Sequence, residues 1–302
     1  MTAGHYLPAV ALALGAAGSF AVSNVTQMDA VTRQRQGGGA GVLVRVARDP
    51  LWLIGLVASI LGFALEATAL SMAPVVLVQP LIVAELPFAL PLAALVAGRR
   101  LGRPEWTGIA MVTAGLAAVV AVIRPTDSPI VADGRTWGLL FGLTALFAAV
   151  LVGAGSRLGT VGRTTAIAAA AGSAFGLLSV VTKAATHQFQ AHGVAALGRW
   201  EPWALAAVGL VGMTLAQNAY RAGPLAVSLP LLDLGEPLCG SLIAVAAFHE
   251  HLGGFGAPSA ALFGLAVALI VGGVAVLDRS PLVQTAAPPG GCSERLPTTN
   301  VA

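Results

Sequence analysis

Apolar residues fill most of this chain in nine long runs, which short segments containing Pro, Gly or Arg separate from one another. A helix needs about 20 mostly apolar residues to cross the hydrocarbon core of a bilayer, so each run predicts one transmembrane helix. The runs cover residues 7–30, 50–72, 75–98, 104–124, 136–155, 164–187, 202–221, 224–247 and 258–277. The pattern therefore predicts an all-α integral membrane protein with about nine spans.

Composition agrees with this class of protein. Hydrophobic residues make up 57% of the 302 positions and charged residues only 10%, whereas soluble domains carry about 25% charged residues. We expect residues 1–279 to form one transmembrane domain that is embedded in the lipid bilayer. Residues 280–302 are rich in Pro, Thr, Gly and Ser, which predicts a disordered tail.

Three prolines of the third run recur in the eighth, each 150 residues later: Pro74, Pro80 and Pro87 correspond to Pro224, Pro230 and Pro237. Proline in a helix interior removes a hydrogen bond, so we expect helix breaks in both runs. Duplicated, interrupted spans are typical of transporters that are built from two repeats. We assign repeats to residues 7–124 and 164–277, with the fifth span, 136–155, linking them. Span one and span six start on opposite sides, so the repeats would have inverted topology.

The basic residues predict the orientation. Of 16 Lys and Arg residues, 12 follow odd-numbered runs and three follow even-numbered runs, while Lys183 lies inside a run. Cytoplasmic loops carry an excess of Lys and Arg. We therefore expect a plasma membrane protein with its N-terminus outside and its C-terminus in the cytoplasm. The net charge of +3 reports this orientation and does not indicate a nucleic-acid partner.

Four carboxylic acids lie well inside the predicted spans. An ionised side chain at a helix centre costs about 2.5–3.5 kcal/mol on insertion scales, so such residues are functional candidates by default. An acidic excess suits a cation, a proton or an amine. The alternative is a structural role, in which each acid is neutral and hydrogen-bonded to backbone carbonyls that have lost their helical partner at a proline. The four are Glu66, Glu85, Asp233 and Glu236, of which the last two are i,i+3 neighbours on one helix face.

Other polar residues of the spans are weaker candidates. Lys183 could pair with Glu66, extend to the membrane surface or contact a solute. A second group could line the pathway or simply bond neighbouring helices: Asn24, Gln79, Gln217 and Asn218. Small residues that recur four positions apart predict close helix packing at Gly138 and Gly142 and at Gly172 and Gly176. The His249-Glu-His251 sequence lacks zinc-site spacing and is interpreted as a helix end.

Three short motifs carry a family resemblance. The sequence FHEHL at 248–252, before a Gly-rich ninth run, resembles the drug/metabolite (EamA-like) transporter superfamily. Within it, APVVLVQPL at 73–81 is similar to the AP-x-x-LVTPL run of NIPA-type magnesium transporters, and AQNAYRA at 216–222 is similar to the segment before their second core helix. The resemblance implies a helical bundle that transports by alternating access. The chain departs from the NIPA pattern at Gln79, where that pattern has Thr, and at Phe63, because the acid here is Glu66.

The leading hypothesis is a carrier for a small cationic or amine-bearing solute, driven by protons or by the membrane potential. A divalent-cation pathway through Glu85 and Glu236 is the first alternative, because hydrated magnesium needs only one or two carboxylates. A non-transporting structural or assembly protein is the second. We find no nucleophile motif, metal-ligand spacing or nucleotide loop, so we expect neither an enzyme nor a cofactor. Homodimer formation is left open.

Overall fold

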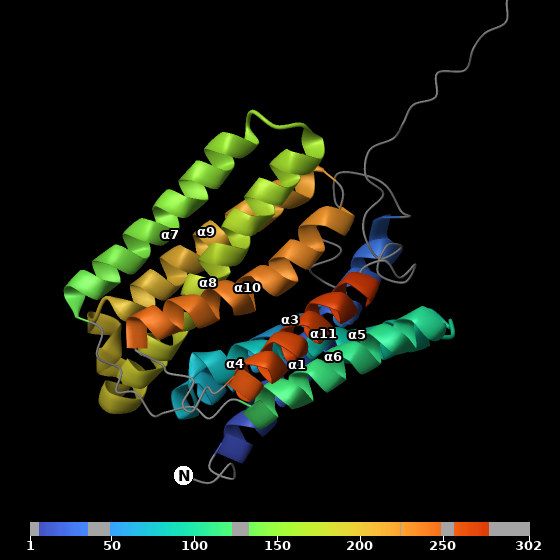
Figure 1. Ribbon diagram of the computed structural model, residues 1–302, viewed down its shortest axis with the longest axis horizontal. Helices are drawn as coiled ribbons and strands as arrows, with labels where there is room; N and C mark the ends of the chain where they lie inside the picture. Colours follow the sequence, from blue (N-terminus) through green and yellow to red (C-terminus); the bar gives the residue numbers. More distant parts are fainter. Residues whose placement is uncertain (1–5, 36–48, 123–132, 224, 249–256, 278–302) are drawn as a thin grey trace, which may run out of the picture.

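The computed structural model describes residues 6–35, 49–122, 133–223, 225–248 and 257–277, and helices are the only regular secondary structure in these ranges (Figure 1). The predicted Pro224, the His249–His251 sequence and the tail from residue 280 lie outside them. The elements are α1 (Leu7–Arg35), α3 (Pro50–Met72), α4 (Val75–Ile82), α5 (Glu85–Val96), α6 (Arg103–Val122), α7 (Gly134–Gly155), α8 (Thr160–His192), the 3-10 helix η2 (Gly193–Gly198), α9 (Glu201–Ala222), α10 (Leu225–Phe248) and α11 (Ala257–Leu277).

In the described residues each predicted run is mainly helical, and the apolar character of the helices supports the membrane assignment. Six helical segments are long and apolar enough to cross a bilayer: Leu7–Gln27, Pro50–Met72, Val75–Val96, Arg103–Val122, Gly134–Gly155 and Thr160–Gly198. Shorter apolar helices cover Leu234–Phe248 and Ala261–Leu277. The described chain is therefore that of an all-α, membrane-embedded protein.

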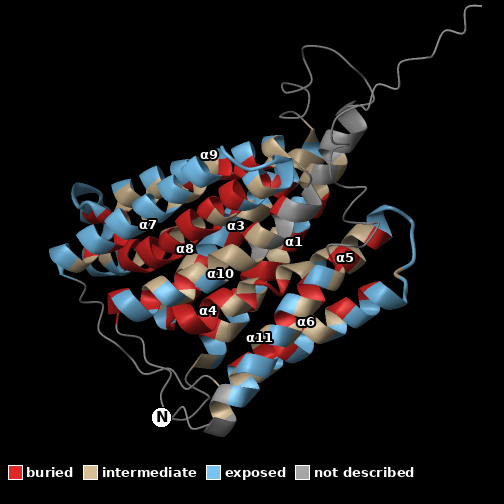
Figure 2. Ribbon diagram, turned by 45° about the horizontal axis from the view of Figure 1, so that its top comes forward, coloured by how far each residue is buried: buried red, intermediate tan, exposed pale blue. Residues whose placement is uncertain are grey.

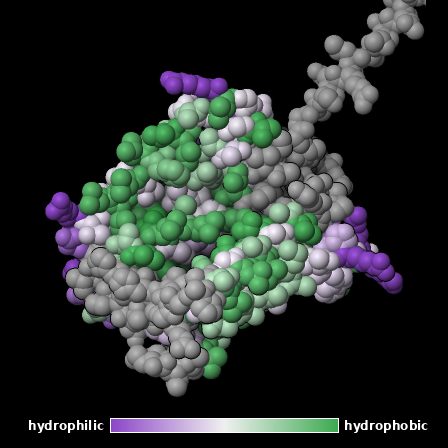
Figure 3. Space-filling view, in the orientation of Figure 1, coloured by the Kyte–Doolittle hydropathy of each residue, from purple (hydrophilic) through white to green (hydrophobic). Residues whose placement is uncertain are grey.

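The outer surface of the bundle is apolar, as lipid contact requires. Large side chains such as Val57, Leu143 and Leu210 are 65%, 60% and 70% exposed. In Figure 3 apolar residues cover most of the coloured face, and the strongly hydrophilic ones lie at its edges. An exposed apolar surface of this extent is typical of a membrane interaction site rather than of a soluble monomer.

The helices form two groups that meet along α4, α8 and α10 (Figure 1). In one group α8 packs against α7, α9 and α10; in the other α1 packs against α3, and α6 packs against α11. Contacts of α10 with α4, and of α3 with α8, join the groups. Buried residues follow α8 and α4 through the middle of the bundle in Figure 2. These helices are where a buried polar site can lie.

Standard local signals set the start of the second and third spans. Asp49 caps α3 because its side chain accepts a hydrogen bond from the backbone N–H of Leu51, with Pro50 as the first helical residue. Ala73 is extended, with φ −144° and ψ 159°, because Pro74 follows it. The helix α4 then begins at Val75.

The predicted interruption of the third run is present. Because Pro87 has no N–H, it cannot donate to the carbonyl of Val83, and the N–H of Leu86 donates there instead at 3.2 Å. The chain makes a turn at Val83 and Ala84. As a result the span divides into α4 and α5, and Glu85 becomes the first residue of the second half.

The matching interruption of the eighth run is absent. Helix α10 continues through Pro230 and Pro237 from Leu225 to Phe248, so the prediction of a helix break there is wrong. A proline removes one hydrogen bond and can kink a helix without ending it when the rest of the helix is well packed. The packing that supports α10 comes from α8.

Glycines bring the backbones of α8 and α10 into contact. A Cβ atom on Gly176 would lie 2.5 Å from the backbone N of Gly240, and one on Gly172 would lie 2.9 Å from Cα of Gly235. The predicted close packing at Gly172 and Gly176 is thus confirmed, since only glycine fits there. At Gly138 and Gly142 a Cβ would meet nothing within 4 Å, so the same prediction for α7 is wrong within this chain.

We expect Gly176→Ala to destabilise the protein by about 1–3 kcal/mol, because the new methyl group forces α8 and α10 apart. Gly138→Ala is the matched control: its methyl group meets open space, and the higher helix propensity of Ala should leave stability unchanged or raise it by up to about 1 kcal/mol. Thermal unfolding of both variants in one detergent measures the difference. Equal unfolding temperatures would contradict the packing of these two helices.

Candidate functional site

Three glutamates from three helices form a polar cluster inside the described part of the bundle. Glu66 on α3 is 7% exposed, and Glu85 on α5 and Glu236 on α10 are half-buried. Glu66 lies within electrostatic reach of both other carboxyls, and Glu85 lies within reach of Glu236. The structure thus brings together three of the four acids that the sequence singles out. We call Glu66, Glu85 and Glu236 the carboxylate cluster.

Each carboxyl of the cluster accepts a hydrogen bond from an uncharged side chain on another helix. Nε2 of Gln79 on α4 donates to Oε1 of Glu66 at 3.1 Å, and Oγ of Ser179 on α8 donates to Oε1 of Glu236 at 3.1 Å. Nδ2 of Asn24 on α1 donates to Oε1 of Glu85. Neutral donors orient a carboxylate and stabilise its charge without cancelling it.

The position of Glu85 follows directly from the broken third span. The span is interrupted between Pro80 and Pro87, so that α4 ends at Ile82 and α5 begins at Glu85. Glu85 therefore lies in the first turn of a half-helix inside the bundle. The N-terminus of a helix carries a partial positive charge and free N–H groups. The partial positive charge of the helix N-terminus stabilises a carboxylate at this position.

Three interacting carboxyl groups in a desolvated site cannot all be ionised without compensation. Their mutual repulsion adds to the cost of removing each charge from water. A bound cation, bound protons or an alternation between the two relieves that repulsion. The cluster is therefore chemically suited to exchange protons for a positively charged group.

Ser179 is the member of this arrangement that the sequence reasoning missed. It lies seven positions after Gly172 and three after Gly176, so all three residues share one face of α8. That face contacts α10. The helical period, extended from the two glycines, would have identified Ser179 as a neighbour of the eighth span.

Lys183 lies one turn beyond Ser179 on α8 and is buried, with 7% exposure. This burial does not fit an extension to the membrane surface. Its Nζ lies 5.2 Å from the ring centroid of Phe248, over the aromatic face, which is a cation–π arrangement. The predicted pairing with Glu66 stays a prediction.

Two further predicted residues lie away from the cluster. Gln217 and Asn218 are exposed on α9, and Nδ2 of Asn218 donates to the carbonyl of Thr214 in the same helix at 2.9 Å. Helix α9 packs mainly against α8. Asp233 belongs to α10, but its side chain lies outside the described residues.

The cluster is not a preformed chelating site. Among the described residues, no three His, Cys, Asp or Glu side chains converge closely enough to hold a metal ion. Any cation held by Glu66, Glu85 or Glu236 would therefore keep part of its own shell or bind through a single charged group.

Comparisons with known proteins find one similar chain over most of the length. No protein-family model matches this chain, and no solved structure matches it. An uncharacterized protein of Corynebacterium glutamicum is 28% identical over 237 residues, which cover 77% of this chain and 81% of that protein. The chain is thus similar to a bacterial protein whose description assigns no activity.

Proposed function

We propose that the protein is a multi-pass transporter of the drug/metabolite type, which moves a small cationic or amine-bearing solute by alternating access. The observation that carries this proposal is the convergence of Glu66, Glu85 and Glu236 inside a largely apolar helical bundle. Such a cluster costs free energy, and a structural role alone gives no reason for three acids. Protons or the membrane potential would drive transport.

The packing order of the helices supports two inverted repeats over nine spans. In the proposed first repeat α1 packs against α3, and in the second α8 packs against α9. The third spans of the two repeats contact each other through α4 and α10, and the fourth spans do so through α6 and α11. A two-fold relation between repeats would produce this pattern, with α7 as the linking span.

The carboxylate cluster joins the two proposed repeats, as an alternating-access site should. Glu66 and Glu85 belong to the first repeat and Glu236 to the second. Protons and a cationic solute would compete for the same carboxyls, so binding of one would release the other. A relative movement of the repeats would then expose the cluster to one side of the membrane at a time.

A NIPA-like pathway for magnesium is the second candidate. The feature that favours it is the approach of Glu85 and Glu236 from the two third spans, since hydrated magnesium needs only one or two carboxylates. A structural or assembly protein is the remaining alternative. In that case, neutralising the carboxylates would change stability or partner binding and no flux.

We expect Glu85→Gln and Glu236→Gln to lower amine-driven proton flux by about tenfold or more, because each substitution removes a charge-assisted contact to the solute. The measurement uses purified protein in liposomes that contain a pH dye, with a panel of amines under a proton gradient. Glu105→Gln is the matched control, since Glu105 is a buried acid on α6, outside the cluster.

The same liposomes carry a magnesium-sensitive dye. Magnesium entry with wild type that both cluster variants abolish would replace the amine carrier by the divalent-cation pathway. Unchanged flux of every solute in both cluster variants would refute transport through the carboxylate cluster.

An odd number of spans places the two termini on opposite sides of the membrane. The C-terminal tail contains Cys292, and Cys239 is the other cysteine. In a Cys239→Ser background, a membrane-impermeant maleimide should label Cys292 only after cells are opened, whereas a cysteine introduced by Thr2→Cys should react in intact cells. Labelling of both positions from one side would contradict nine spans.

A further inference from the structure

A second polar site lies at one end of the bundle, apart from the carboxylate cluster. A cavity of about 450 Å³ lies between the first turns of α7, the last part of α8 and the start of α9. Ala184 of its wall follows Ser179 by five residues, or about 7.5 Å along the helix axis. We call this cavity the α7–α9 pocket. The residues that matter for its chemistry are Trp137, Phe141, Gln188, Arg199, Trp200 and Glu201.

Aromatic rings form one wall of the α7–α9 pocket. The ring centroids of Trp137 and Trp200 are 5.1 Å apart, and those of Phe141 and Trp200 are 6.0 Å apart, both in edge-to-face geometry. Aromatic faces attract cations. Phe248, whose centroid lies 6.2 Å from that of Trp137, already has the ammonium of Lys183 over its ring. The protein itself thus places a cation against this group of rings.

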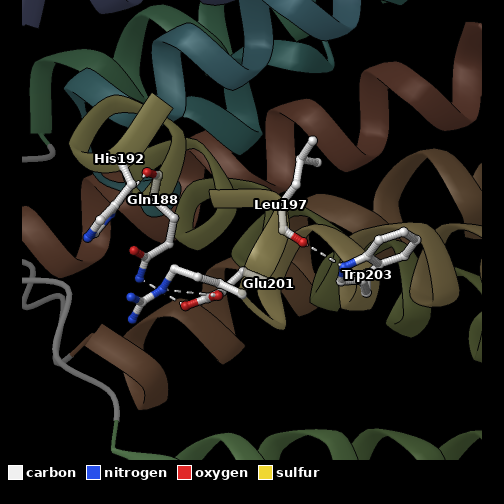
Figure 4. A network of polar contacts seen from close by, with 6 residues as sticks. Gln188, His192, Leu197, Glu201 and Trp203 are labelled. Carbon is white, nitrogen blue, oxygen red and sulfur yellow. Dashed lines mark hydrogen bonds and ion pairs between the residues drawn. The ribbon is translucent and has the colours of Figure 1, made fainter. Parts of the chain in front are cut away.

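Glu201 supplies a buried negative charge with unused hydrogen-bonding capacity. Its side chain is 6% exposed. Gln188 and Glu201 point toward each other in Figure 4, where Nε2 of Gln188 donates to Oε1 of Glu201 at 2.9 Å. Within the described part of the chain, Oε2 of Glu201 is buried and accepts no hydrogen bond. Leaving a buried carboxylate oxygen without a donor is costly.

Arg199 compensates the charge of Glu201 only in part. Its Nε lies 3.8 Å from Oε2 of Glu201, which is too long for a hydrogen bond, and its side chain is 47% exposed. Because about half of the Arg199 side chain is exposed, water partly solvates its charge. A donor that is placed closer to Oε2 could therefore displace the guanidinium, provided that it also compensates the buried charge of Glu201.

We propose that the α7–α9 pocket binds a ligand with a primary ammonium group on an apolar body, and that the ammonium replaces Arg199 at Oε2 of Glu201. The apolar body lies against Trp137, Phe141 and Trp200. The unfilled acceptor needs an N–H donor, which selects a primary amine over a quaternary one. The volume suits a small organic molecule. A role for this pocket as an entry site depends on the proposed amine transport. In that role the solute would meet the pocket on the outer side of the membrane before it reaches the carboxylate cluster.

Binding is tested with 4-bromophenethylamine, because bromine quenches the fluorescence of tryptophans that it contacts. Titration of purified wild type should quench Trp137 and Trp200, and replacing both with Phe identifies their share. We expect Glu201→Gln to weaken binding about tenfold or more. Arg199→Gln should strengthen it several-fold, since it removes the competing cation. The N-trimethyl analogue should bind at least about tenfold more weakly than the primary amine.

Glu105→Gln should leave the quenching unchanged. The opposite signs expected for Arg199→Gln and Glu201→Gln separate binding from misfolding, which would weaken both. Equal affinities for wild type, Arg199→Gln and Glu201→Gln, or equal binding of the N-trimethyl analogue, would overturn the proposal. Quenching reports binding and does not depend on flux. Amine transport without quenching in wild type would refute the α7–α9 pocket only. Quenching without amine transport would refute the proposed function only.

The primary ammonium could belong to a free amine or to a phosphatidylethanolamine headgroup. Repeating the titration in phosphatidylcholine nanodiscs, with and without phosphatidylethanolamine, distinguishes these sources. Competition by phosphatidylethanolamine assigns the pocket to the lipid headgroup, and identical affinities assign it to the free amine.

Discussion

The cost of placing three carboxyl groups in an apolar bundle is the constraint on which the rest of this structure depends. Glu66, Glu85 and Glu236 come from separate helices, and their charges repel one another. The surrounding structure reduces this cost without removing it: each carboxyl accepts a hydrogen bond from a neutral side chain, and Glu85 lies at a helix N-terminus. The remaining repulsion is what a proton or a cation would relieve.

Close packing of α8 against α10 determines the position of Glu236 in this cluster. Contacts at Gly172 and Gly176 hold the two backbones together, and Ser179 on the same face reaches Glu236. On the other side, the break between α4 and α5 carries Glu85 toward the cluster, and Gln79 on α4 bonds Glu66. The helix break thus positions Glu85 in the first half of the chain, and the glycine packing positions Glu236 in the second half.

Much of this arrangement can be predicted from the sequence, because apolar length and proline position act locally. The helical segments and the break near Pro87 follow from such signals. The matching prolines also place Glu85 and Glu236 at a similar depth, but nothing in the sequence shows that Glu66 joins them. Contacts between distant helices do not follow from local signals. The sequence therefore does not identify Ser179 as a neighbour of Glu236, or show that Gln217 and Asn218 are exposed on α9. The sequence shows that these two side chains are polar. Whether they face the bundle or its surroundings depends on the orientation of α9 about its own axis where it packs against α8. The pocket around Glu201 depends on three helix ends, which no single run encodes.

We propose that the carboxylate cluster exchanges protons for a cationic solute. The most direct test of this exchange is to count the protons that purified protein releases into weakly buffered solution when an amine binds. We expect wild type to release protons when the amine binds, and Glu236→Gln to release fewer. Amine binding that releases no protons from wild type would contradict the exchange.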